Sequence, residues 1–203
     1  SRARRRRARR RDRAGGGGPG MSGRPAAFVD RDGTLMHDFH FTDSPADVVL
    51  IPGAGRALGR LNAAGIPVIL VTNQSGIARG FFTMADYERV NARLETLLEA
   101  DGGRLDATYV CPHHPDFSGP CACRKPGTLL FEQAAAAHDL DLAASLYVGD
   151  RFRDIEPGLA LGGTGILVPT DETPPDDVAN ARARAAVVRT LDEAVARFLG
   201  TGA

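Results

Sequence analysis

The stretch 26–34, AAFVDRDGT, decides the fold, because it joins a short apolar run to a turn that contains two aspartates. The stretches 65–76, GIPVILVTNQSG, and 145–154, SLYVGDRFRD, repeat this arrangement. Apolar runs with so few interruptions are typical of strands that are buried on both faces, as in parallel sheets. We therefore predict three strands that each end at a polar turn, the second over 66–71 and the third over 145–149.

The rest of the chain alternates between strand and helix patterns. Residues 107–114 and 164–169 are further strand candidates, and helices are predicted over 53–65, 83–100, 128–140, 155–163 and 189–200. This alternation predicts an α/β fold with a doubly wound, mostly parallel sheet. Ligands of such sheets bind beyond the carboxyl ends of the strands, which is where the three polar turns are expected.

The composition is that of a globular domain, with 203 residues, 43% of them hydrophobic and 25% charged. No apolar run approaches the ~20 residues that cross a bilayer, so no membrane contact is expected. The formal net charge of zero hides an asymmetry: residues 1–13 carry nine arginines and a charge of +8, whereas residues 14–203 carry −8. An acidic folded part argues against broad binding of nucleic acid.

The Arg- and Gly-rich residues 1–20 have no side chains that could fill a core. They predict a disordered tail, followed by one domain over 21–203. The tail has two interpretations: it binds an anionic polymer, or it lies upstream of a true start at Met21. We favour the second, because a glycine-rich linker gives the tail no defined geometry.

Aspartates gather at the predicted strand ends. Asp30 and Asp32 lie two residues apart in the first turn, and Asp150 follows the third strand. Such carboxylates repel one another unless a cation lies between them, and oxygen ligands favour Mg²⁺. One isolated aspartate would be explained as a turn or helix cap, but three at one sheet edge favour a catalytic site.

Two further features are compatible with phosphate chemistry. Thr72, Asn73 and the turn at Gly76 offer a hydroxyl and backbone N–H groups, an arrangement that can hold phosphate but that many α/β turns share. Lys125 is the only lysine beside 24 arginines. A chain that uses arginine for its other cations is expected to keep a lysine where a compact ammonium is needed, with chance as the alternative.

The segment 111–127, CPHHPDFSGPCACRKPG, holds all three cysteines and two of the five histidines. Its pattern C-x-H-x₇-C-x-C offers a tetrahedral zinc site made by Cys111, His113, Cys121 and Cys123, with His114 as the alternative histidine. Two cysteines at i and i+2 form a poor disulfide. Reduced cysteines and a cytoplasmic location are therefore expected, and free thiols without a metal are the alternative.

Four of these stretches resemble the motifs of one enzyme family. DRDGT, VTNQSG, RKPG and GDRFRD are similar to the four motifs of the haloacid-dehalogenase-like phosphatases. TNQSGIARG followed by CPHHP and CxCRKP resembles one branch, the D-glycero-D-manno-heptose 1,7-bisphosphate phosphatases and the related histidinol-phosphate phosphatases. The resemblance covers about 26–168 and implies this fold with a zinc-stapled loop. Only 20 residues separate Asp32 from Gly53, which leaves no room for a large cap domain.

The resemblance also implies roles for individual residues. Asp30 would be the nucleophile and Asp32 the general acid and base, with Thr72 and Lys125 stabilising the transferring phosphoryl group. Asp30, Asp150 and the backbone carbonyl of Asp32 would hold Mg²⁺. Arg124 would bind a distal phosphate. Other implied substrate contacts are Gln74, Ser75, Arg151 and the loop Asp38–Phe41, where Phe41 stands in place of an expected tyrosine. Asn73 would position either the substrate or an aspartate. For Asp154, metal contact and helix capping both remain open.

The leading hypothesis is thus a Mg²⁺-dependent phosphatase that acts on a sugar bisphosphate, D-glycero-D-manno-heptose 1,7-bisphosphate at C7, through an aspartyl-phosphate. A histidinol-phosphate phosphatase is the alternative enzyme, and a ring cation in place of a second phosphate would distinguish its substrate. A zinc-containing nucleic-acid binder that uses the arginine tail is the alternative outside enzymes. A monomer is expected.

Overall fold

The computed structural model describes residues 23–201, so the predicted tail at 1–20 lies outside the described residues. Six strands form one sheet in the order β3-β2-β1-β4-β5-β6, and all neighbouring pairs are parallel. The strands are β1 (Ala27–Val29), β2 (Val68–Asn73), β3 (Ala107–Cys111), β4 (Leu146–Gly149), β5 (Thr164–Leu167) and β6 (Ala186–Val187). The predicted doubly wound parallel sheet is confirmed.

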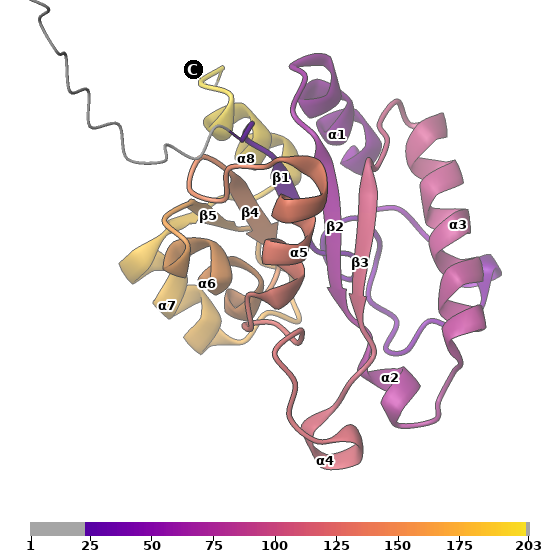
Figure 1. Ribbon diagram of the computed structural model, residues 1–203. Coiled ribbons are helices and arrows are strands. Elements are labelled where there is room, and N and C mark those ends of the chain that lie inside the picture. Colours follow the sequence, from indigo (N-terminus) through magenta and orange to yellow (C-terminus); the bar gives the residue numbers. More distant parts are fainter. Residues whose placement is uncertain (1–22, 202–203) are drawn as a thin grey trace, which may run out of the picture.

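Helices cover both faces of the sheet (Figure 1). One face packs against α1 (Ala54–Ala63), α3 (Met84–Ala100) and α8 (Leu191–Phe198), and the other against α5 (Leu129–His138), α6 (Phe152–Ala160) and α7 (Pro175–Arg184). Because successive side chains of a strand point to opposite faces, Val29 packs with the first group and Phe28 with the second. The short helices α2 (Ser75–Ala78) and α4 (Pro115–Ser118) lie beyond the carboxyl ends of β2 and β3, near the bottom of Figure 1.

The register of the central strands explains where the polar turns meet. β1 lies between β2 and β4, and its residue Val29 is paired with Leu70 on one side and with Val148 on the other. Asp30 follows β1 directly, Asn73 is the last residue of β2, and Asp150 follows β4. The three turns therefore share one edge of the sheet, as predicted.

Some element boundaries differ from the sequence prediction. β2 continues to Asn73 rather than ending at 71, because Thr72 and Asn73 still pair with β3. α6 begins at Phe152 rather than at 155, because Asp154 Oδ2 accepts a hydrogen bond of 2.9 Å from the backbone N–H of Arg151 and caps the helix. The sequence patterns do not predict α7 or β6. The capping box of Thr83 and Asp86 at the start of α3 is present as expected.

No large cap domain covers the carboxyl edge of the sheet within residues 23–201. Between β1 and α1 the only helical element is one turn of 3₁₀-helix at Pro45–Asp47. The site beyond the strand ends is therefore open on that side. None of the helices in the described part of the chain is both long and apolar enough to cross a membrane.

Candidate active site

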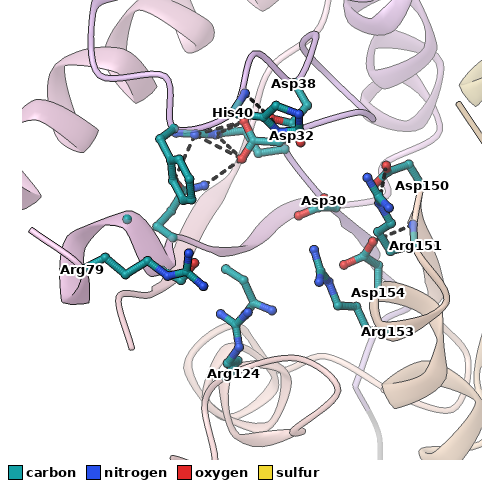
Figure 2. A pocket seen from close by; sticks show the side chains of 16 residues that line it. Asp30, Asp32, Asp38, His40, Arg79, Arg124, Asp150, Arg151, Arg153 and Asp154 are labelled. Carbon is teal, nitrogen blue, oxygen red and sulfur yellow. Dashed lines mark hydrogen bonds and ion pairs between the residues drawn. The ribbon is translucent and has the colours of Figure 1, made fainter. Parts of the chain in front are cut away.

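A pocket of about 330 Å³ lies at the carboxyl ends of the central strands (Figure 2). Its lining includes ten of the residues that the sequence singles out: Asp30, Asp32, Asp38, Phe41, Asn73, Gln74, Ser75, Arg124, Asp150 and Arg151. Thr72 and Lys125 are buried, with 1% and 3% of their surface exposed, and are not among the residues that line the pocket. Residues from the ends of different strands and from the 111–127 segment thus meet at one pocket.

Three carboxylates form the acidic end of this pocket. One oxygen from each of Asp30, Asp150 and Asp154 lies within 4.8 Å of the others. Two glycines make this crowding possible: a Cβ atom at Gly33, where φ is +77°, would lie 2.6 Å from Asp150 Oδ2, and one at Gly149 would lie 2.3 Å from Asp154 Cβ. Clustered hard oxygen ligands of this kind fit Mg²⁺.

The electrostatics of the acidic end favour a cation. Burial, with repulsion from Asp30 and Asp154, raises the pKa of Asp150 to about 8. Burial and repulsion from Asp154 also raise the pKa of Asp30 to about 6, although Lys125 acts in the opposite direction. A bound divalent cation would remove this repulsion and favour the charged carboxylates.

Lys125 supplies positive charge from the protein itself. Its Nζ atom lies 2.7 Å from Asp30 Oδ1 and 2.8 Å from Asp154 Oδ1, and it donates to the backbone oxygen of Val71 at 2.7 Å. Burial acts to lower the pKa of Lys125, but the attraction of Asp154 and Asp30 outweighs it, so the pKa is raised. The lone lysine is thus a charged group in contact with the candidate nucleophile.

Asn73 fixes the backbone of this lysine. Asn73 Oδ1 accepts from the backbone N–H of Lys125 at 3.0 Å, and Asn73 Nδ2 donates to the backbone oxygen of Lys125 at 3.2 Å. The motif resemblance implies that Asn73 positions the substrate or an aspartate, and in the structure both polar atoms of its amide bond the backbone of Lys125. The end of β2 and the RKPG turn are joined by this pair of hydrogen bonds.

Asp32 is held by two neighbours rather than by the acidic cluster. Arg31 pairs with both oxygens of its carboxylate, and Gln74 Nε2 donates to Asp32 Oδ2 at 2.8 Å. The same Gln74 amide donates to Thr72 Oγ1 at 2.9 Å. Gln74 lines the pocket, as expected of a substrate contact, but its amide already forms hydrogen bonds with other side chains of the site.

Arginines form a second end of the pocket. Figure 2 shows Arg79, Arg124 and Arg153 on the opposite side of Asp30 from Asp32. Burial lowers the pKa of Arg124, and the positive charges of Arg153 and Arg79 lower it further. A partly buried guanidinium whose charge is disfavoured by its neighbours in this way is stabilised by a bound anion, so this part of the pocket is a candidate anion site. Arg151, by contrast, pairs with Asp150 at 3.1 Å.

Aromatic rings hold one of these arginines in place. The guanidinium of Arg79 lies 5.8 Å from the ring centre of Phe41 and 5.6 Å from that of Phe117. Arg79 Nη2 also lies 2.7 Å from His114 Nε2. Phe41 is thus at the pocket as predicted, and its contact there is with a cation.

The loop that carries Phe41 is unusual in its backbone. His40 and Phe41 have φ angles of 55° and 63°, in the left-handed region that residues other than glycine rarely adopt. Asp38 Oδ1 accepts from the backbone N–H of His40 at 2.9 Å and supports this turn. Asp38 therefore lines the pocket and also shapes the loop.

The cysteine segment forms a second cluster beside the pocket. Ligand atoms of Cys111, His113, Cys121 and Cys123 lie within 4.8 Å of one another. The separations between them include 3.1 Å for Cys111 to Cys123 and 3.7 Å for Cys111 to Cys121. Four ligands placed about 2.3 Å from a central zinc ion are separated by similar distances, so the donor set fits zinc. The cluster contains His113, whereas His114 contacts Arg79.

Arg31, Arg79 and Arg153 line the pocket without having been predicted from the sequence, and His40 lies there within the predicted loop Asp38–Phe41. With 24 arginines in the chain, an individual arginine carries little signal. The available signal was position: Arg79 lies in TNQSGIARG and Arg153 in GDRFRD, both of which are motif stretches. Asp154, left open between two roles, caps α6 and also contacts Lys125.

Known proteins match the chain in sequence and in structure. Two family models match, one described as HAD-hydrolase-like over 122–194 and one as haloacid dehalogenase-like hydrolase over 27–91. The D-glycero-beta-D-manno-heptose-1,7-bisphosphate 7-phosphatase of Haemophilus ducreyi is 40% identical over 73% of this chain and 85% of its own length. That of Mesorhizobium japonicum is 41% identical over 68% of this chain and 66% of its own length.

A solved structure gives the same result. The D,D-heptose 1,7-bisphosphate phosphatase from B. bronchiseptica, crystallised with magnesium and phosphate, superposes with a TM-score of 0.78. It is 33% identical, and the match covers 88% of this chain and 99% of that one. Identity and coverage of this extent, together with the acidic and cationic groups at the strand ends, confirm the resemblance noted in the motifs. The chain belongs to the D-glycero-D-manno-heptose-1,7-bisphosphate 7-phosphatase family of haloacid dehalogenase-like phosphatases.

Proposed function

We propose that this protein is a Mg²⁺-dependent phosphatase that removes the 7-phosphate of D-glycero-D-manno-heptose 1,7-bisphosphate. One observation carries the proposal: a single pocket joins an acidic cluster, which includes the carboxylate of Asp30, to three arginines (Figure 2). A substrate with a reacting phosphate and a second, distant anion fits both ends.

The reacting phosphate would meet Asp30. The Asp30 carboxylate attacks phosphorus, the bond to the sugar oxygen breaks, and an aspartyl-phosphate forms. Asp30, Asp150 and the backbone carbonyl of Asp32 would hold Mg²⁺, which supplies positive charge to the phosphoryl oxygens when bound. Lys125 and the Thr72 hydroxyl would stabilise the same charge from the protein side.

Asp32 is proposed to move the protons. It donates one to the sugar oxygen as that bond breaks, and it then takes one from the water that hydrolyses the aspartyl-phosphate. Of its side chain, 23% is exposed, so both a leaving group and a water can reach it. Gln74 and Arg31 reach it from the protein side.

The second phosphate of the substrate is proposed to bind Arg124, together with Arg79 and Arg153. The repulsion that Arg153 and Arg79 exert on the Arg124 guanidinium favours an anion at this place in the pocket. It disfavours the ring cation of histidinol phosphate, which is the alternative substrate. Ser75, Asp38 and Phe41 lie around the pocket, where they are proposed to contact the sugar.

The cysteine cluster is proposed to bind one structural zinc ion. Because Arg124 and Lys125 follow Cys123 directly, the metal would position both cations without touching phosphate. Thiolate ligation requires reduced cysteines, which supports a cytoplasmic location. We also propose that the protein acts as a monomer and that residues 1–20 have no part in the reaction.

A panel of phosphate-release assays tests the function. The substrates are both anomers of the heptose bisphosphate, histidinol phosphate and fructose 1,6-bisphosphate, each with and without Mg²⁺. We expect the highest kcat/KM with a heptose bisphosphate and activity only with Mg²⁺. Asp30→Asn is the matched control and should be inactive, because an amide is a poor nucleophile. A clear preference for histidinol phosphate would contradict the proposal.

A further inference from the structure

Arg31 stands between the two aspartates of the first turn, and its side chain turns into the protein. Only 1% of that side chain is exposed, the lowest value among the charged side chains of the ion pairs in the described residues. Its Nε lies 3.1 Å from Asp32 Oδ1, and its Nη2 lies 3.1 Å from Asp32 Oδ2. A buried guanidinium is costly unless its partners are well placed, so this two-pronged contact defines the position of the Asp32 carboxylate.

Gln74 extends the contact to a second group. Arg31 Nη2 donates to Gln74 Oε1 at 3.1 Å. Because a guanidinium has no acceptor atom, this bond requires the oxygen of the Gln74 amide to face Arg31. The amide nitrogen then faces the other way, where it donates to Asp32 Oδ2 at 2.8 Å and to Thr72 Oγ1 at 2.9 Å.

The consequence for Thr72 concerns its proton. A hydroxyl that accepts from Gln74 keeps its own O–H free to donate elsewhere. In the proposed reaction that donor would point to a phosphoryl oxygen. Arg31 therefore contacts Asp32 directly, whereas its link to Thr72 passes only through the amide of Gln74, which makes its own bonds to both groups.

Tyr87 supports Arg31 from a third side. The Arg31 Cζ atom lies 5.3 Å from the ring centre of Tyr87. Tyr87 is itself buried, on the first turn of α3 after the capping box. A cation placed over an aromatic ring in this way has little freedom to rotate. The guanidinium is thus held by the core of the domain and not by the substrate.

We propose that Arg31 is a positioning residue for the proton transfers of Asp32. This inference rests on the proposed function. In the first step the proton of Asp32 passes to the sugar oxygen as the phosphorus–oxygen bond breaks. In the second step a water attacks phosphorus, Asp32 takes the proton of that water, and the Asp30 carboxylate leaves. Both transfers need the carboxylate at one fixed place, which Arg31 and Gln74 define.

The test compares leaving groups that differ in their need for a proton. An alkoxide leaves only with a proton, whereas p-nitrophenolate leaves without one. We expect Arg31→Met to slow phosphate release from a sugar phosphate by at least about a hundredfold, the usual scale of general acid-base catalysis. The first burst of p-nitrophenolate from p-nitrophenyl phosphate should stay within about threefold of wild type, because that step needs no proton from Asp32. Steady-state turnover after the burst should fall, because water attack still needs Asp32.

Two comparisons separate positioning from a general loss of structure. If Arg31 acts through Asp32, adding Arg31→Met to Asp32→Asn should cause almost no further loss on the sugar phosphate. Arg60→Met removes an ion-paired arginine on α1 away from the pocket, so it should leave the reaction rates with both substrates unchanged. Arg31→Lys keeps the buried charge but not the fork, so it should show the same pattern with a smaller loss. If Arg31→Met does not fold, the comparison of the two substrates in Arg31→Lys tests the positioning role instead.

Equal losses in the burst and on the sugar phosphate would overturn the inference, because they indicate a structural role. Additive losses in the double variant would overturn it too. These outcomes differ from a failure of the proposed function, which would appear in wild type as a preference for another phosphate ester. In that case the preferred alkyl phosphate replaces the heptose in the same comparison.

Discussion

The Nζ atom of Lys125 lies 2.7 Å from Oδ1 of Asp30, so the only lysine of the chain contacts the carboxylate that follows β1. The other two acceptors around this ammonium are Asp154 Oδ1 at 2.8 Å and the backbone oxygen of Val71 at 2.7 Å. An ammonium has three N–H donors, so each donor has one acceptor. The contacts require a compact cation, which explains why the site uses lysine in a chain otherwise rich in arginine.

Replacing this ammonium by a guanidinium should therefore impair catalysis. Lys125→Arg retains the charge, but its planar fork cannot serve three acceptors arranged around one point. A displacement of about 1 Å at this position costs roughly a hundredfold in rate, so we expect kcat to fall by about that factor. Steady-state kinetics on the heptose bisphosphate measure this. Arg56→Lys, the same exchange in reverse at an exposed arginine, should leave kcat unchanged, and wild-type kcat in Lys125→Arg would contradict the argument.

The crowded carboxylates predict a pH-dependent effect of Mg²⁺ on stability. The pKa of Asp150 in the folded, metal-free protein is about 8, against an ordinary value of 3.8. Folding thus favours the neutral carboxyl of Asp150. Its contribution to the free energy of unfolding is present at low pH and is lost as the pH rises through about 8. Mg²⁺ binds the charged form. Its addition should therefore raise the melting temperature by several degrees more at about pH 8.5 than at about pH 6.

Asp150→Asn is the matched control for this measurement. The amide does not titrate, so the extra effect of Mg²⁺ at high pH should disappear. The metal-free variant should also be more stable than metal-free wild type at high pH, because the repulsion with Asp30 and Asp154 is relieved. If wild type and variant show the same dependence on pH, the acidic cluster does not titrate as argued.

The arginine group predicts a change in substrate preference. Arg124→Ala should weaken the reaction of the heptose bisphosphate more than that of the 7-monophosphate. A charge-assisted hydrogen bond contributes about 1.5–3 kcal/mol, so the ratio of the two kcat/KM values should shrink at least about tenfold. Arg93→Ala, at an exposed position of α3, is the control. Equal losses on both substrates would instead place Arg124 at the reacting phosphate.

The sequence predicts the parts of the fold that burial determines. The three runs at β1, β2 and β4 are apolar because both of their faces are covered, and this pattern can be recognised without a structure. Helix α7 gives no such signal: in PDDVANARAR only Ala181 is buried, so no apolar stripe marks the helix. Strand β6 has two residues at the edge of the sheet, too few for a periodic pattern.

Some residues of the candidate site could likewise be predicted from the sequence, and others could not. Asp30, Lys125 and the cysteines could be predicted because their residue types are rare or sit at informative spacings. The role of Gln74 could not be, because it depends on which way a buried amide turns, and Arg31 determines that. The position of the Arg79 guanidinium depends on the rings of Phe41 and Phe117. These two residues lie far apart in the sequence and come together only in the fold.

The cysteine cluster predicts one zinc ion per chain. Metal analysis of purified protein should find it, and Cys121→Ser should remove it. Cys121 is the better choice for this test than Cys111, which is fully buried at the end of β3 in the second core cluster and whose exchange would also disturb packing. Burial raises the pKa of Cys111 to about 12, so zinc must displace a tightly held proton there, and zinc affinity should weaken as the pH is lowered.

Loss of zinc should affect the site more than the fold. Without the metal, the segment that carries Arg124 and Lys125 is held by the hydrogen bonds of Asn73 and the three contacts of Lys125 Nζ. Displacement of these two cations should lower kcat/KM by on the order of a hundredfold. The far-ultraviolet circular dichroism should change little, because the sheet has its own core on both faces. Mg²⁺ should not rescue the variant, since a hard cation binds thiolates poorly. Full activity in zinc-free Cys121→Ser would mean that these contacts position Lys125 without the metal, and that the cluster serves another purpose.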